Sequence, residues 1–317
     1  MALPTDSFKK FNYWLRPSKQ VERKIMIEIL LSAMQSGYDI RKYTYFGFGS
    51  VYYADFVMFH KYLYINDMIC IEWSDVRKRM KFNLPYEFIT LRMSSLQDAL
   101  PKIVKKRTKY LAWVDFDRQL DADMLRDIDD CILTLPMQSI FIVTVDARAR
   151  VPRHIVESNE LTPKQQDKWL LKQFNEEFGL FVERKIVAKD LDDSEIPGLY
   201  YDAIIGRINE TIRVRDGAEF IQFFNFLYAD GAPMLTIGGM IGTAEDREKM
   251  AVTLNHEFAA GGREPVLIKV PHLTFREKQW LDSNLQCDKA CFELDDDGLE
   301  NYRRFYRQYP TFVESLT

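Results

Sequence analysis

Two patterns of apolar residues alternate along this chain, and their order predicts its fold. Short continuous apolar runs are typical of buried strands, and stretches in which apolar residues recur every three or four positions are typical of helices. The runs that predict strands are 43–46, 68–71, 88–91, 110–114 and 139–145. Because helical stretches and short connections separate these runs, we expect an α/β fold with a doubly wound, mostly parallel sheet.

A hairpin is predicted at the end of this sheet. Two β-favouring runs, 221–228 and 234–241, flank Asp230-Gly231. An Asp-Gly pair between two such runs is a strong signal for a hairpin. We therefore expect a seven-stranded sheet that is closed by an antiparallel hairpin.

The segments outside the sheet are expected to be mainly helical. A helix is predicted after residues 16–19, with Met26, Leu30 and Ala33 on its apolar face. The start of this helix is basic enough to bind a phosphate or a carboxylate, but a solvated helix end is the commoner role and is the one we expect. The predicted division is 1–39 for an N-terminal helical segment, 40–242 for a Rossmann-like domain with an insertion at about 147–198, and 243–317 for a C-terminal α/β extension.

Several further elements are predicted in the insertion and the extension. The insertion should contain a polar helix at 163–178 and an extended stretch at 180–187. The extension should contain a helix at 243–258, a strand at 266–270 and an aromatic helix at 297–309. The aromatic stripe of the last helix is expected to serve packing.

Composition limits the classes of function. The chain has 317 residues, of which 47% are hydrophobic, and a formal net charge of −4. A charge so close to balance disfavours a general nucleic-acid binder. Basic runs at 77–81 and 105–107 leave nucleic acid as a partner that is possible but not favoured, because such runs are usually solvated.

Cysteine usage and hydropathy indicate a compartment. The four cysteines are few for this length and show no disulfide pattern, which is typical of a reducing environment. No apolar run reaches transmembrane length, and the first residues lack a signal-peptide pattern. We expect a cytoplasmic protein without a membrane partner.

A short glycine sequence is the first candidate for binding chemistry. Gly47 and Gly49 lie between a predicted strand and a predicted helix, where a tight turn could let a ligand approach the backbone and the N–H groups that follow. Glu72 ends the next predicted strand, a suitable place for a carboxylate that binds ribose hydroxyls. The pattern fits many nucleotide binders, and an ordinary βαβ unit is the alternative.

The ordered motifs resemble the Rossmann-like, class I S-adenosylmethionine-dependent methyltransferases over about residues 40–242. The chain is particularly similar to a group of bacterial O-methyltransferases with an Arg-Pro-x-Lys helix start, a GFGS turn and an Asp-Phe/Tyr-Asp turn. The motifs that carry the resemblance are Gly47-Phe48-Gly49, Glu72, Ser94 to Asp98, Asp115-Phe116-Asp117 and the hairpin at Asp230-Gly231.

This resemblance implies S-adenosylmethionine as the cofactor and a role for each motif. The glycine turn would lie against the methionine part, Glu72 would accept hydrogen bonds from the ribose, and Ser94 would border the adenine. The implied cofactor-binding residues are Gly47, Phe48, Gly49, Ser50, Glu72, Trp73, Ser94, Ser95 and Asp115, and the catalytic candidates are Asp115, Asp117 and His154.

Differences from the motifs of other methyltransferases limit the kinds of acceptor that we expect. The sequence that follows Val114 is Asp-Phe-Asp-Arg, which is not the Asn/Asp-Pro-Pro-Tyr/Phe signature of enzymes that methylate base amines. No Pro-Cys pair indicates cytosine chemistry. Aromatic residues replace the usual acidic residue before Gly47, so the contact to the cofactor amine is missing from the pattern.

A bound metal is not expected either. Asp115, Asp117 and Asp146 follow predicted strands and could hold Mg²⁺, but Ala147 stands where metal-dependent relatives have asparagine. We therefore expect an O-methyltransferase with an unknown acceptor. The alternative is a catalytically inactive protein of this fold that binds a nucleotide, a nucleic acid or a protein partner in a bacterial multi-protein system. A homodimer is a further arrangement that the sequence allows.

Overall fold

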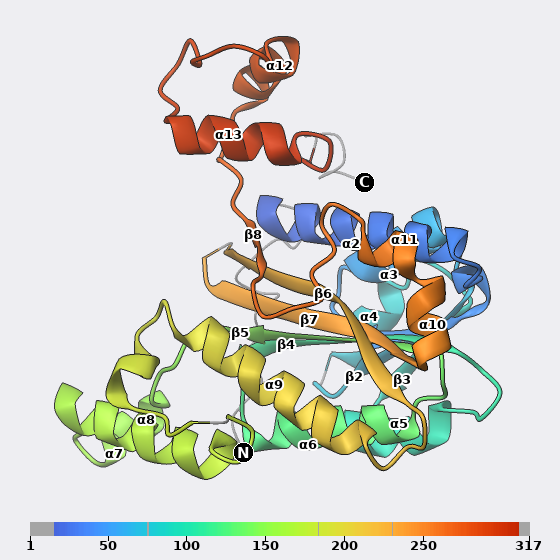
Figure 1. Ribbon diagram of the computed structural model, residues 1–317, viewed down its shortest axis with the longest axis vertical. Helices are drawn as coiled ribbons and strands as arrows, with labels where there is room; N and C mark the ends of the chain where they lie inside the picture. The colour runs from blue at the N-terminus through green and yellow to red at the C-terminus, as the bar shows by residue number, and fades with distance from the viewer. Residues whose placement is uncertain (1–15, 75, 183, 230, 311–317) are drawn as a thin grey trace.

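The computed structural model describes residues 16–74, 76–182, 184–229 and 231–310. Its centre is an eight-stranded sheet in the order β3-β2-β1-β4-β5-β7-β6-β8, with helices on both faces (Figure 1). The strands are β1 Thr44–Phe48, β2 Asp67–Glu72, β3 Ile89–Met93, β4 Tyr110–Gln119, β5 Ile140–Asp146, β6 Glu219–Ala229, β7 Pro233–Gly242 and β8 Val266–Ile268. The predicted α/β class is confirmed.

The direction of the strands also follows the prediction. β7 is antiparallel to both β5 and β6, and the other neighbouring pairs are parallel. The β6–β7 hairpin is therefore the predicted one. The eighth strand, β8, comes from the C-terminal extension, where the sequence predicted a strand, and it pairs with β6 at the edge of the sheet.

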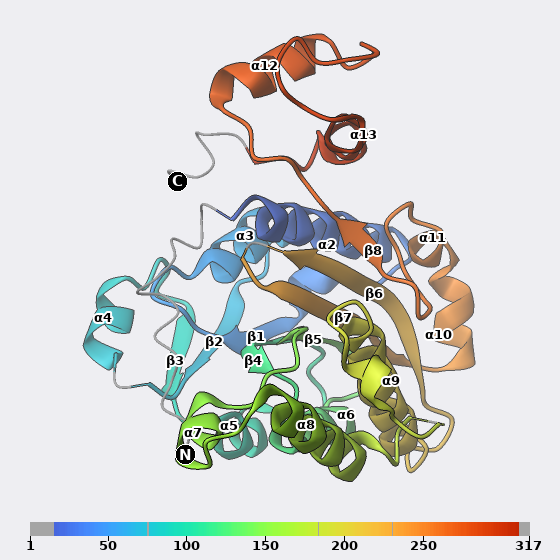
Figure 2. The same ribbon diagram turned by 90° about the vertical axis from the view of Figure 1, so that its left-hand side faces the viewer.

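Each face of the sheet carries its own helical layer, as Figures 1 and 2 show. One layer contains α2 Pro17–Gln35, α3 Ala54–Leu63, α4 Arg77–Phe82, α10 Ala244–Lys249 and α11 Ala251–Leu254. The other contains α5 Leu96–Ile103, α6 Ala122–Thr134, α8 Pro163–Phe178 and α9 Ile196–Ile212, with the short α7 Arg153–Ser158 beside α8. Among the described residues there are also two short 3₁₀ helices, η2 Ile40–Lys42 and η3 Ala188–Leu191.

The strand side chains divide between two apolar clusters. Because successive side chains of a strand point to opposite faces, Phe46 and Val114 pack in the cluster with α5, α6 and α9. Tyr45 and Trp113 pack in the cluster with α2 and α3. All four side chains are buried, so the central strands are covered on both faces, as expected for a parallel sheet.

The C-terminal helices form a small lobe beyond the α2 layer (Figure 1). They are α12 Phe275–Ser283, which is capped by the Thr274 side chain, and α13 Asp296–Phe305. Tyr302 and Tyr309 are buried in the apolar cluster of this lobe. The aromatic stripe therefore serves packing, as predicted. Gln308 connects the lobe to α2 by donating to Glu28 at 2.9 Å.

Two predicted elements differ from the structure. Described residues in 180–187 form turns and loop before η3 rather than an extended stretch, and the predicted helix at 243–258 ends early and divides into α10 and α11 at Met250. The first strand is also longer than predicted, because Gly47 and Phe48 continue its pairing with β2. The tight turn therefore begins at Gly49.

Replacing Gly47 should test how strongly packing fixes the end of β1. A Cβ at this position would lie 2.5 Å from Tyr45 Oη and 2.8 Å from the Trp113 carbonyl oxygen. We expect Gly47→Ala to lower the free energy of unfolding by roughly 1–3 kcal/mol, the scale of overpacking, in urea denaturation. Gly262→Ala is the control, because nothing lies within 4 Å of its Cβ position. Equal midpoints for both variants would contradict the prediction.

Candidate functional site

The predicted site residues gather at one edge of the sheet. β1, β2, β4 and β5 are parallel neighbours or near neighbours, so their carboxyl ends meet at the same edge. In the sheet, β2 and β3 lie on one side of β1, and β4 and β5 lie on the other, so the strand order reverses between β1 and β4. Ligands of open α/β sheets bind at such a switch point, and Gly49, Glu72 and Asp115 all lie at this edge.

The glycine segment is fixed by the protein's own packing. Gly49 N–H donates to the Ile71 carbonyl at 2.9 Å. A Cβ at Gly49 would meet Cys70 Sγ and lie 2.7 Å from Met80 Cε. With the contacts of Gly47, this shows that the glycines let β1 pack closely against neighbouring strands and α4. Their predicted contact with a cofactor is a separate matter and remains a prediction.

The turn after Gly49 is short and strained at its end. Ser50 Oγ accepts from Tyr52 N–H at 3.3 Å, and Tyr53 has a left-handed backbone with a φ of 48° before α3 begins. Phe48 forms an edge-to-face contact with Phe116, with ring centroids 5.1 Å apart. This contact links the end of β1 to the predicted Asp-Phe-Asp segment of β4.

Glu72 has a fixed carboxylate at the tip of β2. Its Oε1 accepts hydrogen bonds from Trp73 N–H at 2.9 Å, Ser74 N–H at 2.9 Å and Ser74 Oγ at 2.8 Å. Oε2 receives no hydrogen bond from any residue that the structure describes. The hydrogen bonds to Oε1 therefore orient the carboxylate, and its contact with a ribose remains a prediction. The neighbouring Trp73 is 65% exposed.

The serines after β3 have a structural task. Ser95 is the N-cap of α5, and its Oγ accepts from Asp98 N–H at 3.1 Å. The same hydroxyl donates to Asp98 Oδ2 at 2.9 Å. Ser94 lies between β3 and this cap and is partly exposed. A predicted contact of these serines with the adenine must coexist with the cap.

Asp115 is paired with a buried lysine from the first turn of α2. Lys19 Nζ lies 3.0 Å from Asp115 Oδ2 and 3.0 Å from Glu22 Oε2, and it donates to Tyr228 Oη at 2.8 Å. The ammonium also lies 4.5 Å from the centroid of the Trp113 ring. Lys19 is 2% exposed, so the charge is held away from water.

Electrostatics keep this lysine charged. Burial by itself lowers the pKa of Lys19, but the attraction of Asp115 and Glu22 outweighs that effect and raises the pKa well above its ordinary value. The opposite balance holds for Glu22, where burial raises the pKa although Lys19 opposes it. Lys19 is therefore a buried cation that lies beside Asp115 at the candidate site.

A second buried pair fixes the helix that follows the glycine turn. Arg23 is 1% exposed, and its Nε donates to Oδ1 of Asp55 in the first turn of α3. The predicted solvated start of α2 is therefore wrong. Ser18, Lys19, Gln20, Glu22 and Arg23 are all buried, because the first turn of α2 lies over the sheet and its charges pair with β4 and α3.

A sequence signal for this burial was present. In a helix, residues separated by three or four positions share a face. Lys19, Glu22 and Arg23 therefore continue the apolar stripe of Met26 and Leu30 towards the N-terminus. Charged residues in line with a buried stripe indicate buried pairs, but the sequence does not name their partners.

The remaining catalytic candidates lie on the surface. Asp117 is exposed, within a stretch of β4 whose register shifts between Asp115 and Gln119. His154 is exposed on α7, and no contact recorded for the described chain joins it to Asp115. Of the predicted catalytic residues, only Asp115 has a built environment of buried polar groups.

Asp146 is bound by an arginine. Arg148 Nε donates to its Oδ1 at 2.9 Å. Within the described ranges, no group of three or more His, Cys, Asp or Glu side chains is arranged to hold a metal ion.

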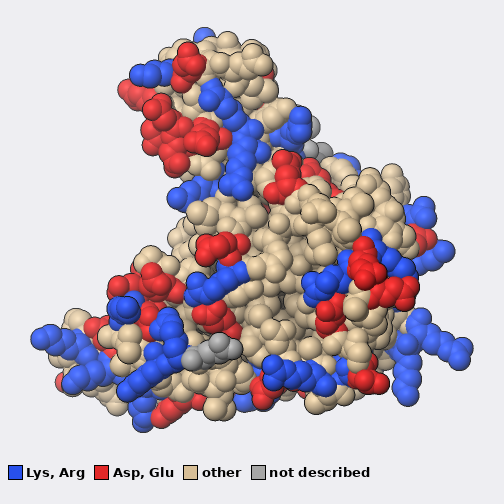
Figure 3. Space-filling view, in the orientation of Figure 1, with Lys and Arg blue, Asp and Glu red and all other residues tan. Residues whose placement is uncertain are grey.

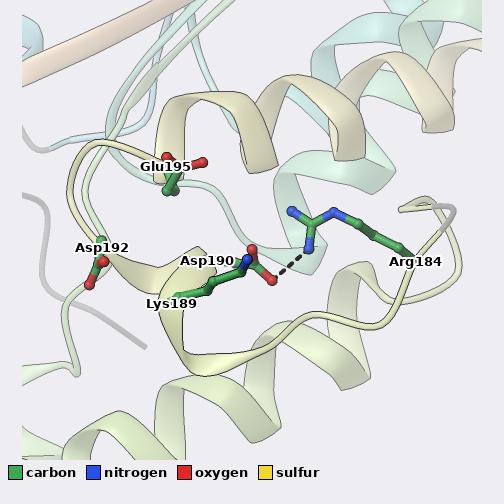
Figure 4. Close-up of a pocket in the computed structure, with 5 residues that line it drawn as sticks. All are labelled: Arg184, Lys189, Asp190, Asp192 and Glu195. Carbon is green, nitrogen blue, oxygen red and sulfur yellow. Dashed lines mark hydrogen bonds and ion pairs between the residues drawn. The ribbon is translucent and has the colours of Figure 1, made fainter.

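A cavity lies away from these residues, in the insertion. Its volume is about 420 Å³. Figure 4 shows that its lining is wholly charged and comes from the loop before η3, from η3 and from the start of α9. Arg184 pairs with Asp190 across it at 2.6 Å. None of the site residues predicted from the sequence lines this cavity.

The sheet order with its reversed β7 is that of a Rossmann-like methyltransferase fold. A family model described as "Putative O-methyltransferase" matches residues 11–317, and the chain belongs to this family. The resemblance predicted from the sequence is therefore confirmed. With it the methyltransferase class and its methyl donor, S-adenosylmethionine, are confirmed, whereas the acceptor is not specified by the family.

Solved structures also match the chain at low identity. Trm1 from Pyrococcus horikoshii, in complex with S-adenosyl-L-methionine, is 11% identical with a TM-score of 0.42, and the match covers 74% of this chain and 58% of that chain. The N-methyltransferase NodS from Bradyrhizobium japonicum WM9 is 9% identical with a TM-score of 0.35, and the match covers 70% and 97%. No curated protein matches the sequence.

Breaking the Arg23–Asp55 pair should destabilise the fold. Because Arg23→Met leaves the Asp55 carboxylate without its buried partner, we expect the free energy of unfolding to fall by roughly 3–5 kcal/mol, measured by urea denaturation. The control is Arg126→Met, which removes an ion pair with Asp123 whose side chains are 62% and 61% exposed and should change little. Similar effects of the two substitutions would contradict the burial of α2.

Proposed function

We propose that this methyltransferase is catalytically active, holds its cofactor at the switch point between β1 and β4, and methylates an oxygen of its acceptor beside Asp115. The observation that supports this proposal is a pair of carboxylates at one edge of the sheet. Glu72 and Asp115 each have one oxygen fixed by the protein. In each carboxylate the other oxygen has no partner among the described residues.

The residues at this edge fit the cofactor. Glu72 Oε2 is suited to the ribose hydroxyls, because a carboxylate oxygen accepts hydrogen bonds readily. The turn at Gly49 and Ser50 would border the methionine part, and Ser94 the adenine. When bound, the cofactor supplies an activated methyl group on a sulfonium.

The protein's task is alignment and removal of one proton. Methyl transfer to a hydroxyl needs the acceptor oxygen in line with the methyl group, and the hydroxyl proton must leave. Asp115 Oδ1 would accept that proton in our proposal. Its side chain is 22% exposed, so it is accessible to a ligand although its other oxygen is bound. Asp117 and His154, both exposed, are secondary candidates for the same role.

A second candidate function is supported by the surface of α4. Arg77, Lys78 and Lys81 are exposed on this helix, and Trp73 and Phe82 beside them are 65% and 89% exposed. Cations interleaved with exposed aromatic rings suit single-stranded nucleic acid. Elsewhere, basic and acidic side chains are interspersed over most of the face in Figure 3. Nucleic-acid binding without catalysis is therefore the alternative.

We also propose that the protein works in the cytoplasm of a bacterium. Cys70, Cys131, Cys287 and Cys291 are free thiols, which agrees with the reducing cytoplasm of a bacterium. No helix within the described ranges is long and apolar enough to cross a membrane. A protein partner or a homodimer would be compatible with this setting.

Cofactor binding by Glu72 variants tests the proposed function. Glu72→Ala should weaken the binding of S-adenosylmethionine and of its demethylated product by roughly 1.5–3 kcal/mol, because one charge-assisted contact to the ribose is lost. Isothermal titration calorimetry measures both affinities. Glu87→Ala, at an exposed position just before β3, is the control. If the folded wild-type protein binds neither ligand, the proposed function is wrong.

Salt-dependent binding of RNA tests the second candidate. If α4 binds nucleic acid, Arg77→Glu with Lys78→Glu should weaken binding of a single-stranded RNA oligonucleotide and make its salt dependence shallower, since fewer counterions are released. Fluorescence anisotropy over a range of salt concentrations gives both quantities. The matched control is Lys105→Glu with Lys106→Glu, two exposed cations after α5. Equal losses in both pairs would indicate non-specific attraction only.

A further inference from the structure

A closed circuit of buried polar groups surrounds the Lys19 ammonium. Glu22, which pairs with Lys19, accepts a hydrogen bond from Thr236 Oγ1 on β7. Thr236 and Thr144 on β5 share a hydrogen bond of 2.8 Å, and Trp113 Nε1 donates to Thr144 Oγ1 at 2.9 Å. The Lys19 ammonium lies over the face of the Trp113 ring, and this contact closes the circuit. The circuit therefore connects α2 with three strands.

We infer that Lys19 is a positioning residue for Asp115, which fixes Oδ2 of that carboxylate so that Oδ1 faces the ligand at the edge of the sheet. The inference rests on the proposed function, and it adds a residue from outside the sheet to the site. Lys19 cannot reach a ligand itself, because it is 2% exposed and its ammonium already contacts Asp115, Glu22 and Tyr228.

The position of Lys19 is determined by more than one contact. Its ammonium lies between the Trp113 ring and the Tyr228 hydroxyl, and Glu22 attracts it from one helical turn further along α2. Because several groups hold the Lys19 ammonium, it has little freedom to move with the Asp115 carboxylate. Asp115 must therefore adopt the orientation that Lys19 sets.

Asp115 is well placed to use that orientation. Trp113 and Asp115 are two positions apart on β4, so both point towards the α2 face of the sheet. Gly47 pairs with Trp113 across β1 and β4, which places Asp115 beside the chain as it leaves β1 for the glycine turn. The free oxygen of Asp115 is thus next to the segment that borders the proposed cofactor site.

A double-mutant cycle on ligand binding tests this role. We propose to measure the affinity for S-adenosylmethionine and its demethylated product by calorimetry in wild type, Lys19→Met, Asp115→Asn and the double variant, with thermal midpoints recorded for each. Asp115 is also among the cofactor-binding residues that the family resemblance implies, so Lys19→Met and Asp115→Asn should each weaken binding by roughly tenfold, the scale of one charge-assisted hydrogen bond from the cofactor to this carboxylate. The double variant should bind no more weakly than Asp115→Asn alone, because Lys19 acts through Asp115.

Rescue by a conservative change separates positioning from general stability. Lys19→Arg keeps the cation and should recover most of the affinity that Lys19→Met loses. If Lys19→Met does not fold, Lys19→Met with Glu22→Gln replaces it, since this pair leaves no unpartnered carboxylate at the fully buried position 22. Glu22→Gln alone is then the reference.

The outcomes distinguish the inference from the proposed function. Wild-type affinity in Lys19→Met or in Asp115→Asn, or losses that multiply in the double variant, would overturn the positioning role while the proposed function stands. Failure of the folded wild-type protein to bind either ligand would overturn the proposed function and this inference together.

Discussion

The placement of α2 depends on charges that the fold removes from water. Lys19 and Arg23 are buried on the first turns of this helix, and each has a carboxylate partner on another element. Taking an ion out of water costs several kcal/mol, and that cost is offset only when the partner lies in good geometry. The helix can therefore dock in one register, in which Lys19 meets Asp115 and Arg23 meets Asp55. A buried apolar stripe alone would tolerate small shifts along the sheet.

The ion pairs of Lys19 and Arg23 place α2 beside the candidate site. Asp55 belongs to the first turn of α3, directly after the glycine turn, and Asp115 lies at the open edge of β4. One helix thus fixes both sides of the switch point between β1 and β4. The predicted division of the chain placed α2 in a segment before the methyltransferase domain, yet its side chains complete the polar contacts at that domain's site.

Regular patterns made much of the fold predictable from the sequence. The strands, the hairpin and the caps at Ser95, Asp121 and Thr274 follow from local rules, because a buried strand, a turn or a helix start needs particular residues nearby. The candidate site at Glu72 followed from its place after a strand. The role of Lys19 was missed because two of its three partners, Asp115 and Tyr228, are 96 and 209 positions away, and no local rule identifies a partner so distant.

The packing around β1 is consistent with the departure of this chain from the usual glycine motif. The acidic residue expected before Gly47 is replaced by Phe46, which is fully buried in the cluster with α5 and α6. A carboxylate at that position would be buried among apolar side chains, away from water and without a cation. Asp115, in contrast, is a partly exposed carboxylate next to β1, and its Oδ2 is paired with the buried ammonium of Lys19. In our proposal the acidic group of the site is therefore on β4, where Lys19 of α2 pairs with it.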